Sequence, residues 1–310
     1  MSAMRDAQGG GRRVAVTATA IALLALTALL ITSAAAGQAG GQGGVLDNAQ
    51  STYRSTAHAW LGPMSSIARR LFVTLAGLEI SVSGLLWTIR RDSMDEIAGR
   101  FLIKFILLSF VLLLITGASY WLPPIVNSLA YAGQVAGIAP VAAGPSEVVD
   151  LGVYIAFSKI DTTGLPLSTS SLLTAVFAIV ARLVILGAFL WVAALLVLAW
   201  VESYVAIAGG VLFLGFGGFR ATAQYAENYL NYLVFLGVRL FLFYLLLGVG
   251  MTIFGTTITG MPPTATPQEM AELVAMAVIF AALILRIPGN TADRVAGSAS
   301  FGLAAALRSL

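Results

Sequence analysis

The chain has no cysteine and a single histidine, His58. A cysteine nucleophile, a disulfide framework and the usual zinc ligand sets are therefore excluded, and we interpret His58 as a surface residue of a helix. The sequence also has no G-x-x-x-x-G-K-[ST] loop for ATP phosphates, no H-E-x-x-H pair and no G-x-S-x-G elbow. These absences favour a protein that is not an enzyme and that needs no cofactor or metal.

Charged residues are scarce as well. They make up 10% of the 310 residues, whereas 59% are hydrophobic and the mean hydropathy is +0.92. A soluble domain carries roughly 25% charged residues, so lipid must be the solvent of a chain this apolar. Its length suits roughly five to seven spans of 20 residues each. The net charge of +3 includes no basic run that would mark a nucleic-acid face.

Residues 1–36 have the pattern of a signal segment. Three arginines precede an apolar run over residues 14–31, and small residues follow at 34–37. This order is typical of a signal peptide. Because the apolar run is long, an uncleaved signal anchor is the alternative. Either one places residues 37–70 outside the cytoplasm, as an extracytoplasmic linker followed by an amphipathic helix.

Residues 45–61 carry apolar side chains at spacings of three and four, which predicts that short amphipathic helix. We expect Gly62 and Pro63 to end it. The helix either lies on the outer membrane surface, anchored by Trp60, or offers a docking surface to a periplasmic partner. We favour the membrane surface.

Five apolar stretches are long enough to cross a bilayer, and they cover residues 71–89, 101–119, 171–200, 233–254 and 270–287. The first two form one segment, 71–119. Trp121 marks an interface after it, and we expect Pro123 and Pro124 to prevent the helix from continuing. Residues 120–170 are predicted to form a central periplasmic loop with short helical pieces, and residues 288–310 a cytoplasmic tail.

Residues 203–219 are apolar but short and rich in glycine. If they crossed the bilayer fully, the basic tail would lie outside, against the positive-inside rule. We therefore predict a re-entrant element within residues 171–287, because glycines allow irregular backbone where protein or water covers it. The expected fold class is all-α: a polytopic helical membrane protein with about five transmembrane helices, this re-entrant element and an N-terminal signal segment.

Three charged residues fall inside the predicted spans: Glu79, Arg182 and Arg239. A charge at the bilayer centre costs at least roughly 2.5–3.5 kcal/mol on insertion scales, so each should face protein, water or a partner charge. They line a pathway or pair across helices. Alternatively, the two arginines snorkel to headgroups and Glu79 is simply paired. The residues alone leave both interpretations open.

The first span has two polar faces. One is a stripe of small and hydroxyl residues at helical spacing, which suits close helix packing, and its members are Thr74, Gly77, Ser81, Gly84 and Thr88. Glu79 and Ser83 lie on the other side. A helix with two such faces belongs inside an assembly more naturally than at the rim of a monomer.

The segment from Trp200 to Leu230 holds the most specific pattern. Glu202 follows a hydrophobic helix, a glycine-rich apolar stretch comes next, and Gly217-Gly218-x-Arg220-x-Thr222 leads into another helix. This pattern, within the layout of residues 45–290, resembles the TrbL/VirB-type polytopic protein of conjugative type IV secretion systems. We expect Glu202 and Arg220 to be a structural pair that flanks the re-entrant element.

The resemblance implies a multi-pass channel or scaffold component of the bacterial inner membrane. Such a component takes part in mating-pair formation, in translocation of DNA or protein substrate and in assembly of the pilus base. The implied partners are a minor pilin, a bitopic scaffold protein, cytoplasmic ATPases, membrane lipid, further copies of the chain and, transiently, the translocated DNA or protein.

A polytopic small-solute transporter is the alternative function. Its support is the set of intramembrane charges and a broken helix of the kind that transporters use. The lack of an inverted repeat between the two halves of the sequence argues against it. No nucleophile and base are visible that would favour an integral-membrane enzyme.

Overall fold

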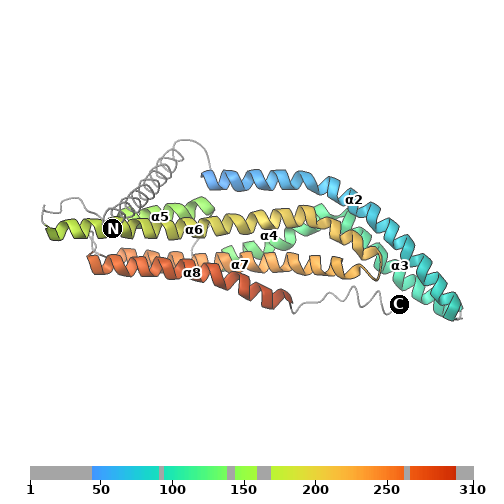
Figure 1. Cartoon of the computed structure of the whole chain (residues 1–310). Coiled ribbons are helices and arrows are strands. Elements are labelled where there is room, and N and C mark those ends of the chain that lie inside the picture. Colours follow the sequence, from blue (N-terminus) through green and yellow to red (C-terminus); the bar gives the residue numbers. More distant parts are fainter. Residues whose placement is uncertain (1–43, 91–93, 138–143, 159–168, 262–265, 298–310) are drawn as a thin grey trace, which may run out of the picture. The chain divides into compact units, whose positions relative to one another are not determined.

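The computed structural model describes residues 44–90, 94–137, 144–158, 169–261 and 266–297 (Figure 1). Every regular element within these ranges is a helix, so the all-α prediction is confirmed. The predicted signal segment over residues 1–36 lies outside the described residues, as do residues 298–310 of the predicted tail. The fold described below belongs to one compact unit, Gln50–Leu310.

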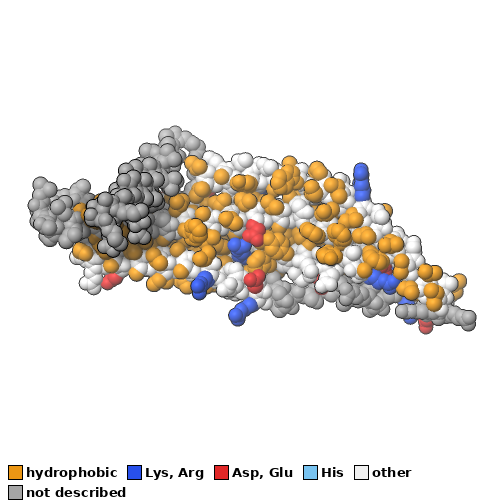
Figure 2. All heavy atoms as spheres, viewed as in Figure 1, with side chains coloured by type: hydrophobic (Ala, Val, Ile, Leu, Met, Phe, Trp, Pro, Cys, Tyr) orange, Lys and Arg blue, Asp and Glu red, His pale blue; other side chains and the backbone are white. Residues whose placement is uncertain are grey.

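Five of the helices are long and apolar enough to cross a membrane, which confirms a multi-pass membrane protein. They are α2 (Val45–Arg90), α3 (Met94–Thr116), α6 (Thr169–Leu214), α7 (Ala223–Gly260) and α8 (Pro267–Gly297). Figure 2 shows the result in space: hydrophobic side chains cover most of the visible surface of these helices, and charged side chains are sparse. Such a surface needs lipid or other protein as its neighbour.

Helix α2 does not end at Gly62 and Pro63, so that prediction is wrong. The helix continues through Pro63 as far as Arg90. Proline removes one backbone hydrogen bond from a helix, but Leu61 before it and Ala68 after it are both buried against the bundle. Packing on either side of the proline therefore holds the helix together.

The break after α3 also differs from the prediction. It falls at Gly117, while Pro123 and Pro124 lie inside the next helix, α4 (Ala118–Ala136). A side-chain carbon at Gly117 would lie 2.8 Å from the ring of Trp121. Glycine therefore makes this tight junction between two helices possible, and the prolines do not cause the break.

The described parts of residues 120–170 are helical and packed. Helix α4 contacts α7, and α5 (Pro145–Ser158) contacts α6. Val126 of α4 and Ile155 of α5 are fully buried. The short helical pieces were predicted from the sequence, but their burial against the apolar helices was not.

Helix α6 runs without a break through the glycine-rich segment. Residues 203–214 are its last turns, and the reversal follows as a 3-10 turn over Gly215–Gly218. Gly210 serves close packing, since a side-chain carbon there would lie 2.0 Å from the Tyr229 ring of α7. The segment is therefore not a separate broken element, and it adds no sixth long apolar helix to the described ranges.

An aromatic cluster joins α6, α7 and α8. The ring centroids of Phe189 and Phe254 are 5.1 Å apart, and the Phe280 centroid lies 5.9 Å from that of Phe189 and 5.6 Å from that of Phe254.

Helix α8 begins with a capping box. The backbone N–H and the hydroxyl of Thr266 donate to the Glu269 carboxylate, and the Glu269 backbone N–H donates to the Thr266 hydroxyl oxygen. It continues beyond the predicted span end at residue 287, through Pro288.

Helix α2 runs beside the end of α6 and then passes the reversal (Figure 1). Gln50 near its start donates a hydrogen bond of 3.1 Å to the Tyr204 hydroxyl. Further along, the backbone of Ala68 meets Gly215 and that of Phe72 meets Gly218. The stretch from Glu79 to Arg90 then extends roughly 16 Å past this point, at 1.5 Å per residue.

Two glycines allow a matched test of the reversal. A side-chain carbon at Gly218 would lie 2.7 Å from the carbonyl oxygen of Phe72, whereas one at Gly209 would meet nothing within 4 Å. Gly218→Ala should therefore destabilise the detergent-solubilised protein by about 1–3 kcal/mol, through overpacking. Gly209→Ala should leave the thermal unfolding temperature unchanged or raise it. Equal melting of both variants by fluorescence-detected size exclusion would contradict the packing described above.

Candidate functional site: two ion pairs around the helix reversal

Glu79 is fully buried, and both of its carboxylate oxygens accept hydrogen bonds. Lys104 of α3 donates a hydrogen bond of 2.8 Å to its Oε1, and the Ser83 hydroxyl donates one of 3.2 Å to the same atom. The Lys104 Nζ also donates to the Ser83 Oγ at 2.6 Å. Lys104 itself is only 2% exposed. The negative charge of Glu79 on α2 is therefore neutralised by the positive charge of Lys104 on α3 inside the protein.

The second oxygen of Glu79 reaches the reversal. Its Oε2 accepts a hydrogen bond of 3.1 Å from the backbone N–H of Arg220, whose Nε lies 3.8 Å from the same oxygen. A single carboxylate therefore joins α2, α3 and the turn between α6 and α7. We call Glu79, Ser83, Lys104 and the Arg220 backbone the buried ion node.

The reversal closes on itself as well. The Thr222 hydroxyl donates a hydrogen bond of 2.7 Å to the Phe216 carbonyl oxygen. Gly217 and Gly218 are buried, and a side-chain carbon on Gly217 would lie 3.0 Å from Val111 of α3. The Gly-Gly-x-Arg-x-Thr pattern thus encodes a tight turn whose glycines admit α2 and α3.

A second charged group lies on α6 and α7. Arg239 donates a hydrogen bond to the Glu202 Oε2, and the Tyr232 hydroxyl donates one of 2.7 Å to the Glu202 Oε1. This group is partly open, because Glu202 is 31% exposed and Arg239 is 21% exposed. We call Glu202, Tyr232 and Arg239 the open trio.

The structure places the predicted residues differently from the expected pairing. Glu202 and Arg220 are not partners: Glu202 bonds to Arg239, and Arg220 bonds to Glu79. The remaining predicted residue, Arg182 of α6, places its guanidinium carbon 5.3 Å from the ring centre of Phe157 on α5.

Lys104 is the functional candidate that sequence reasoning missed. It falls just inside the apolar stretch 101–119, where a lysine resembles a flanking charge. The sequence did contain a signal for this pair, because the predicted span 71–89 holds one acid, Glu79, and the next span, 101–119, holds one base, Lys104.

The predicted packing stripe of α2 faces away from the rest of the chain. A side-chain carbon on Gly77 or Gly84 would meet nothing within 4 Å. The hydroxyls of Ser81 and Thr88 bond to carbonyl oxygens of their own helix. The stripe therefore takes no part in either charged group.

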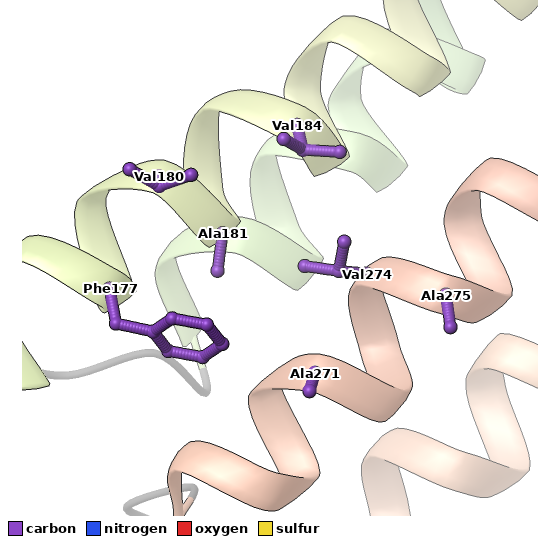
Figure 3. A pocket seen from close by; sticks show the side chains of 7 residues that line it. All are labelled: Phe177, Val180, Ala181, Val184, Ala271, Val274 and Ala275. Carbon is purple, nitrogen blue, oxygen red and sulfur yellow. The ribbon is translucent and has the colours of Figure 1, made fainter.

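The hollow between α6 and α8 offers no polar chemistry. It has a volume of about 240 Å³, and its lining side chains are all apolar. Phe177 and Val180 of α6 lie on one wall and Val274 of α8 on the other (Figure 3). Among the described residues, no three His, Cys, Asp or Glu side chains are grouped so that they could hold a metal ion. The chemistry of the site is therefore hydrogen bonding and charge pairing.

Comparison with known proteins shows which family the chain matches. The family described as TrbL/VirB6 plasmid conjugal transfer protein matches residues 76–287. Conjugal transfer protein TrbL of Rhizobium radiobacter is 26% identical over 272 residues, covering 86% of this chain and 67% of that protein. A probable conjugal transfer protein TrbL of Sinorhizobium fredii is 24% identical over 264 residues, covering 84% of this chain and 66% of that protein. The chain thus spans about two thirds of the length of these curated relatives.

The buried ion node makes a charge-deletion prediction. Glu79→Ala should destabilise the protein by about 3–5 kcal/mol, because it leaves the Lys104 ammonium buried without its anion. The double variant Glu79→Gln, Lys104→Met removes both charges and keeps an acceptor for the Arg220 N–H, so it should recover most of this loss. Thermal unfolding in detergent measures both. A double variant no more stable than Glu79→Ala would refute the pairing.

Arg220 allows a second prediction. Its bond to Glu79 comes mainly from the backbone, while its side chain is 28% exposed and 3.8 Å away. Arg220→Ala keeps the backbone bond, so it should lower the unfolding temperature much less than Glu79→Ala. If the two variants melt alike in the same assay, the guanidinium rather than the N–H holds the reversal.

Proposed function

The chain belongs to the TrbL/VirB6 family of plasmid conjugal transfer proteins, and we propose from this premise that it is an inner-membrane scaffold or channel subunit of a bacterial type IV secretion apparatus. The family confirms the resemblance carried by residues 202–222. Membership also implies association with other subunits of the transfer system. The observation that carries the proposal is the match over residues 76–287, which includes the buried ion node, the reversal and the open trio.

The geometry supports a structural role. The buried ion node joins α2, α3 and the turn between α6 and α7, and its polar groups are hydrogen-bonded to one another. Satisfied polar networks of this kind rigidify a structure, which suits a structural role better than a catalytic one. We therefore propose a non-enzymatic subunit at the base of the pilus. It would contact a minor pilin, a bitopic scaffold protein, cytoplasmic ATPases and further copies of itself, and the translocated DNA or protein in passing.

The transporter alternative loses much of its support. It depended on the intramembrane charges Glu79, Arg182 and Arg239, of which Glu79 is paired with Lys104 and Arg239 with Glu202. The broken helix on which it also depended is continuous, since α6 includes residues 203–214.

Deletion of the gene tests the proposed function. Plasmid transfer between donor and recipient cells should be lost, and the wild-type gene supplied in trans should restore it. The Gly209→Ala variant serves as the matched control and should restore transfer as the wild type does. The purified protein should also carry other transfer subunits with it. Transfer at the wild-type level in the deletion strain would end the proposal.

A further inference from the structure

Two exposed charges of opposite sign lie on helices of the apolar bundle. They are Asp150 of α5 and Arg286 of α8. Within the described ranges no hydrogen bond or ion pair reaches either side chain, in contrast to the charges of the buried ion node and the open trio. Arg286 lies near the end of the apolar stretch 270–287, whereas Asp150 belongs to the stretch 120–170 that was expected to be a loop.

Both charges lie close to the level of the aromatic cluster. A side-chain carbon on Gly152 of α5 would lie 2.5 Å from the Phe189 Cβ, and Asp150 is only about 3 Å from Gly152 along the helix axis. The Phe280 ring lies 5.9 Å from that of Phe189, and Arg286 is about 9 Å further along α8. An arginine side chain is long enough to span the remaining difference of roughly 6 Å.

The two charges also lie on the same side of that cluster. Helix α5 runs opposite to α6, because Phe157 beyond Gly152 meets Arg182, which precedes Phe189. Asp150 is therefore displaced from the cluster toward the reversal. Helix α8 runs in the direction of α6, since its first turns line the hollow beside the first turns of α6. Arg286, which follows Phe280, is displaced toward the reversal as well.

Each charge points away from the bundle. Residues two positions apart lie on nearly opposite sides of a helix, since each residue turns it by about 100°. Gly152 faces α6, so Asp150 faces outward. Ile284 and Pro288, on either side of Arg286, are both buried, so Arg286 faces outward too. The two side chains are therefore available to another polypeptide.

An aspartate at this depth requires a cation. Phe280 lies near the middle of the apolar stretch 270–287, and exposed neighbours such as Ile279 and Leu283 need lipid or protein around them. A carboxylate at such a depth is costly unless a partner charge or water faces it. An arginine reaches the headgroups by snorkelling, but the short aspartate side chain does not. Glu147, which is exposed one turn away, adds a second negative charge and favours a basic partner over water alone.

The chain itself carries a base that matches this requirement. Four described bases are already engaged within one copy, by an acid or an aromatic ring, and they are Lys104, Arg182, Arg220 and Arg239. Others lie at different depths: Arg54 near the Gln50–Tyr204 bond, Arg69 beside the reversal and Arg294 about 12 Å beyond Arg286. Among the described bases without a bonded partner, Arg286 is the one that comes nearest to the depth of Asp150.

We propose that Asp150 on α5 of one copy pairs with Arg286 on α8 of a second copy. Both helices pack on α6, and Figure 1 shows them on opposite sides of it. The contact thus joins two different surfaces, and repeated rotation about the membrane normal closes a ring. Copies related by such a rotation share one depth, as the pair requires. Ala282, one turn before Arg286, is exposed and lets a helix approach closely. This proposal rests on the self-association included in the proposed function.

A charge swap tests the pair. Copies with two different affinity tags are coexpressed, and recovery of the second tag with the first is measured. Asp150→Arg or Arg286→Asp alone should lower this recovery about tenfold, because like charges then face each other across the contact. Both changes in one chain recreate the pair with reversed polarity and should restore recovery. Arg294→Asp, an exposed base elsewhere on α8, is the matched control and should leave recovery unchanged.

Mixing the two single variants shows whether the pair forms between copies. An Asp150→Arg copy beside an Arg286→Asp copy meets an opposite charge at either contact, whereas two copies of one variant repel. The tags should therefore copurify when they mark different variants and separate when they mark the same one. A pair within one copy would gain nothing from mixing, so equal recovery in the two cases overturns the proposal.

A second measurement leaves both charges in place and does not depend on how the variants fold. A photo-crosslinker at position 282 of the otherwise unchanged chain should join α5 of a second copy. Crosslinks only to lipid, or only to a different subunit, overturn the proposal. So does a folded double variant, judged by its elution volume, that recovers no better than the single variants.

Failure here is separable from failure of the proposed function. If plasmid transfer depends on the gene and the unchanged chain still copurifies with itself, failure of the charge swap overturns this contact alone. If transfer does not need the gene, the proposed function fails first.

Discussion

The carboxylate of Glu79 is the group on which the arrangement around the reversal depends. Three donors share its two oxygens: the ammonium of Lys104, the hydroxyl of Ser83 and the backbone N–H of Arg220. The Arg220 side chain adds an ion pair at 3.8 Å. A buried charge is costly unless it is paired and bonded. Burial of Glu79 therefore requires α2, α3 and the turn to meet in one register. A shift of one residue between α2 and α3 would separate the Glu79 carboxylate from the Lys104 ammonium, and a shift of the turn would remove the Arg220 N–H.

The other end of the bundle depends on different forces. There α6, α7 and α8 meet through Phe189, Phe254 and Phe280, with no ion pair in that cluster. Aromatic packing tolerates small shifts better than a charge pair does, because it has no single bond to lose. The chain thus combines the buried ion node near the reversal with an apolar aromatic core nearer the N-terminal end of α6. The open trio lies between these two regions.

Much of the fold could be predicted from the sequence, because length and hydropathy alone define five apolar helices. The boundaries could not be predicted, since Pro63 and Gly210 weaken a helix locally while tertiary packing holds it. A partner charge was one of the environments that the sequence left open for Glu79, but the identity of that partner depends on the register between α2 and α3, which no local pattern contains. The Gly217-Gly218-x-Arg220 pattern located the reversal. Its contact with α2 comes from residues more than a hundred positions earlier in the chain.

The passage of α2 beyond the reversal has a consequence for the surrounding bilayer. From Phe189 in the aromatic cluster to Gly215 is roughly 39 Å along α6, and the α2–α3 tip lies a further 16 Å or so beyond Glu79. The hydrocarbon layer is only about 30 Å thick. No flat layer of this thickness can cover both exposed apolar residues toward the α2–α3 tip, such as Leu85 and Phe101, and those beside the aromatic cluster. This hydrophobic mismatch means that acyl chains solvate one level of the protein, while neighbouring polypeptide must shield the other.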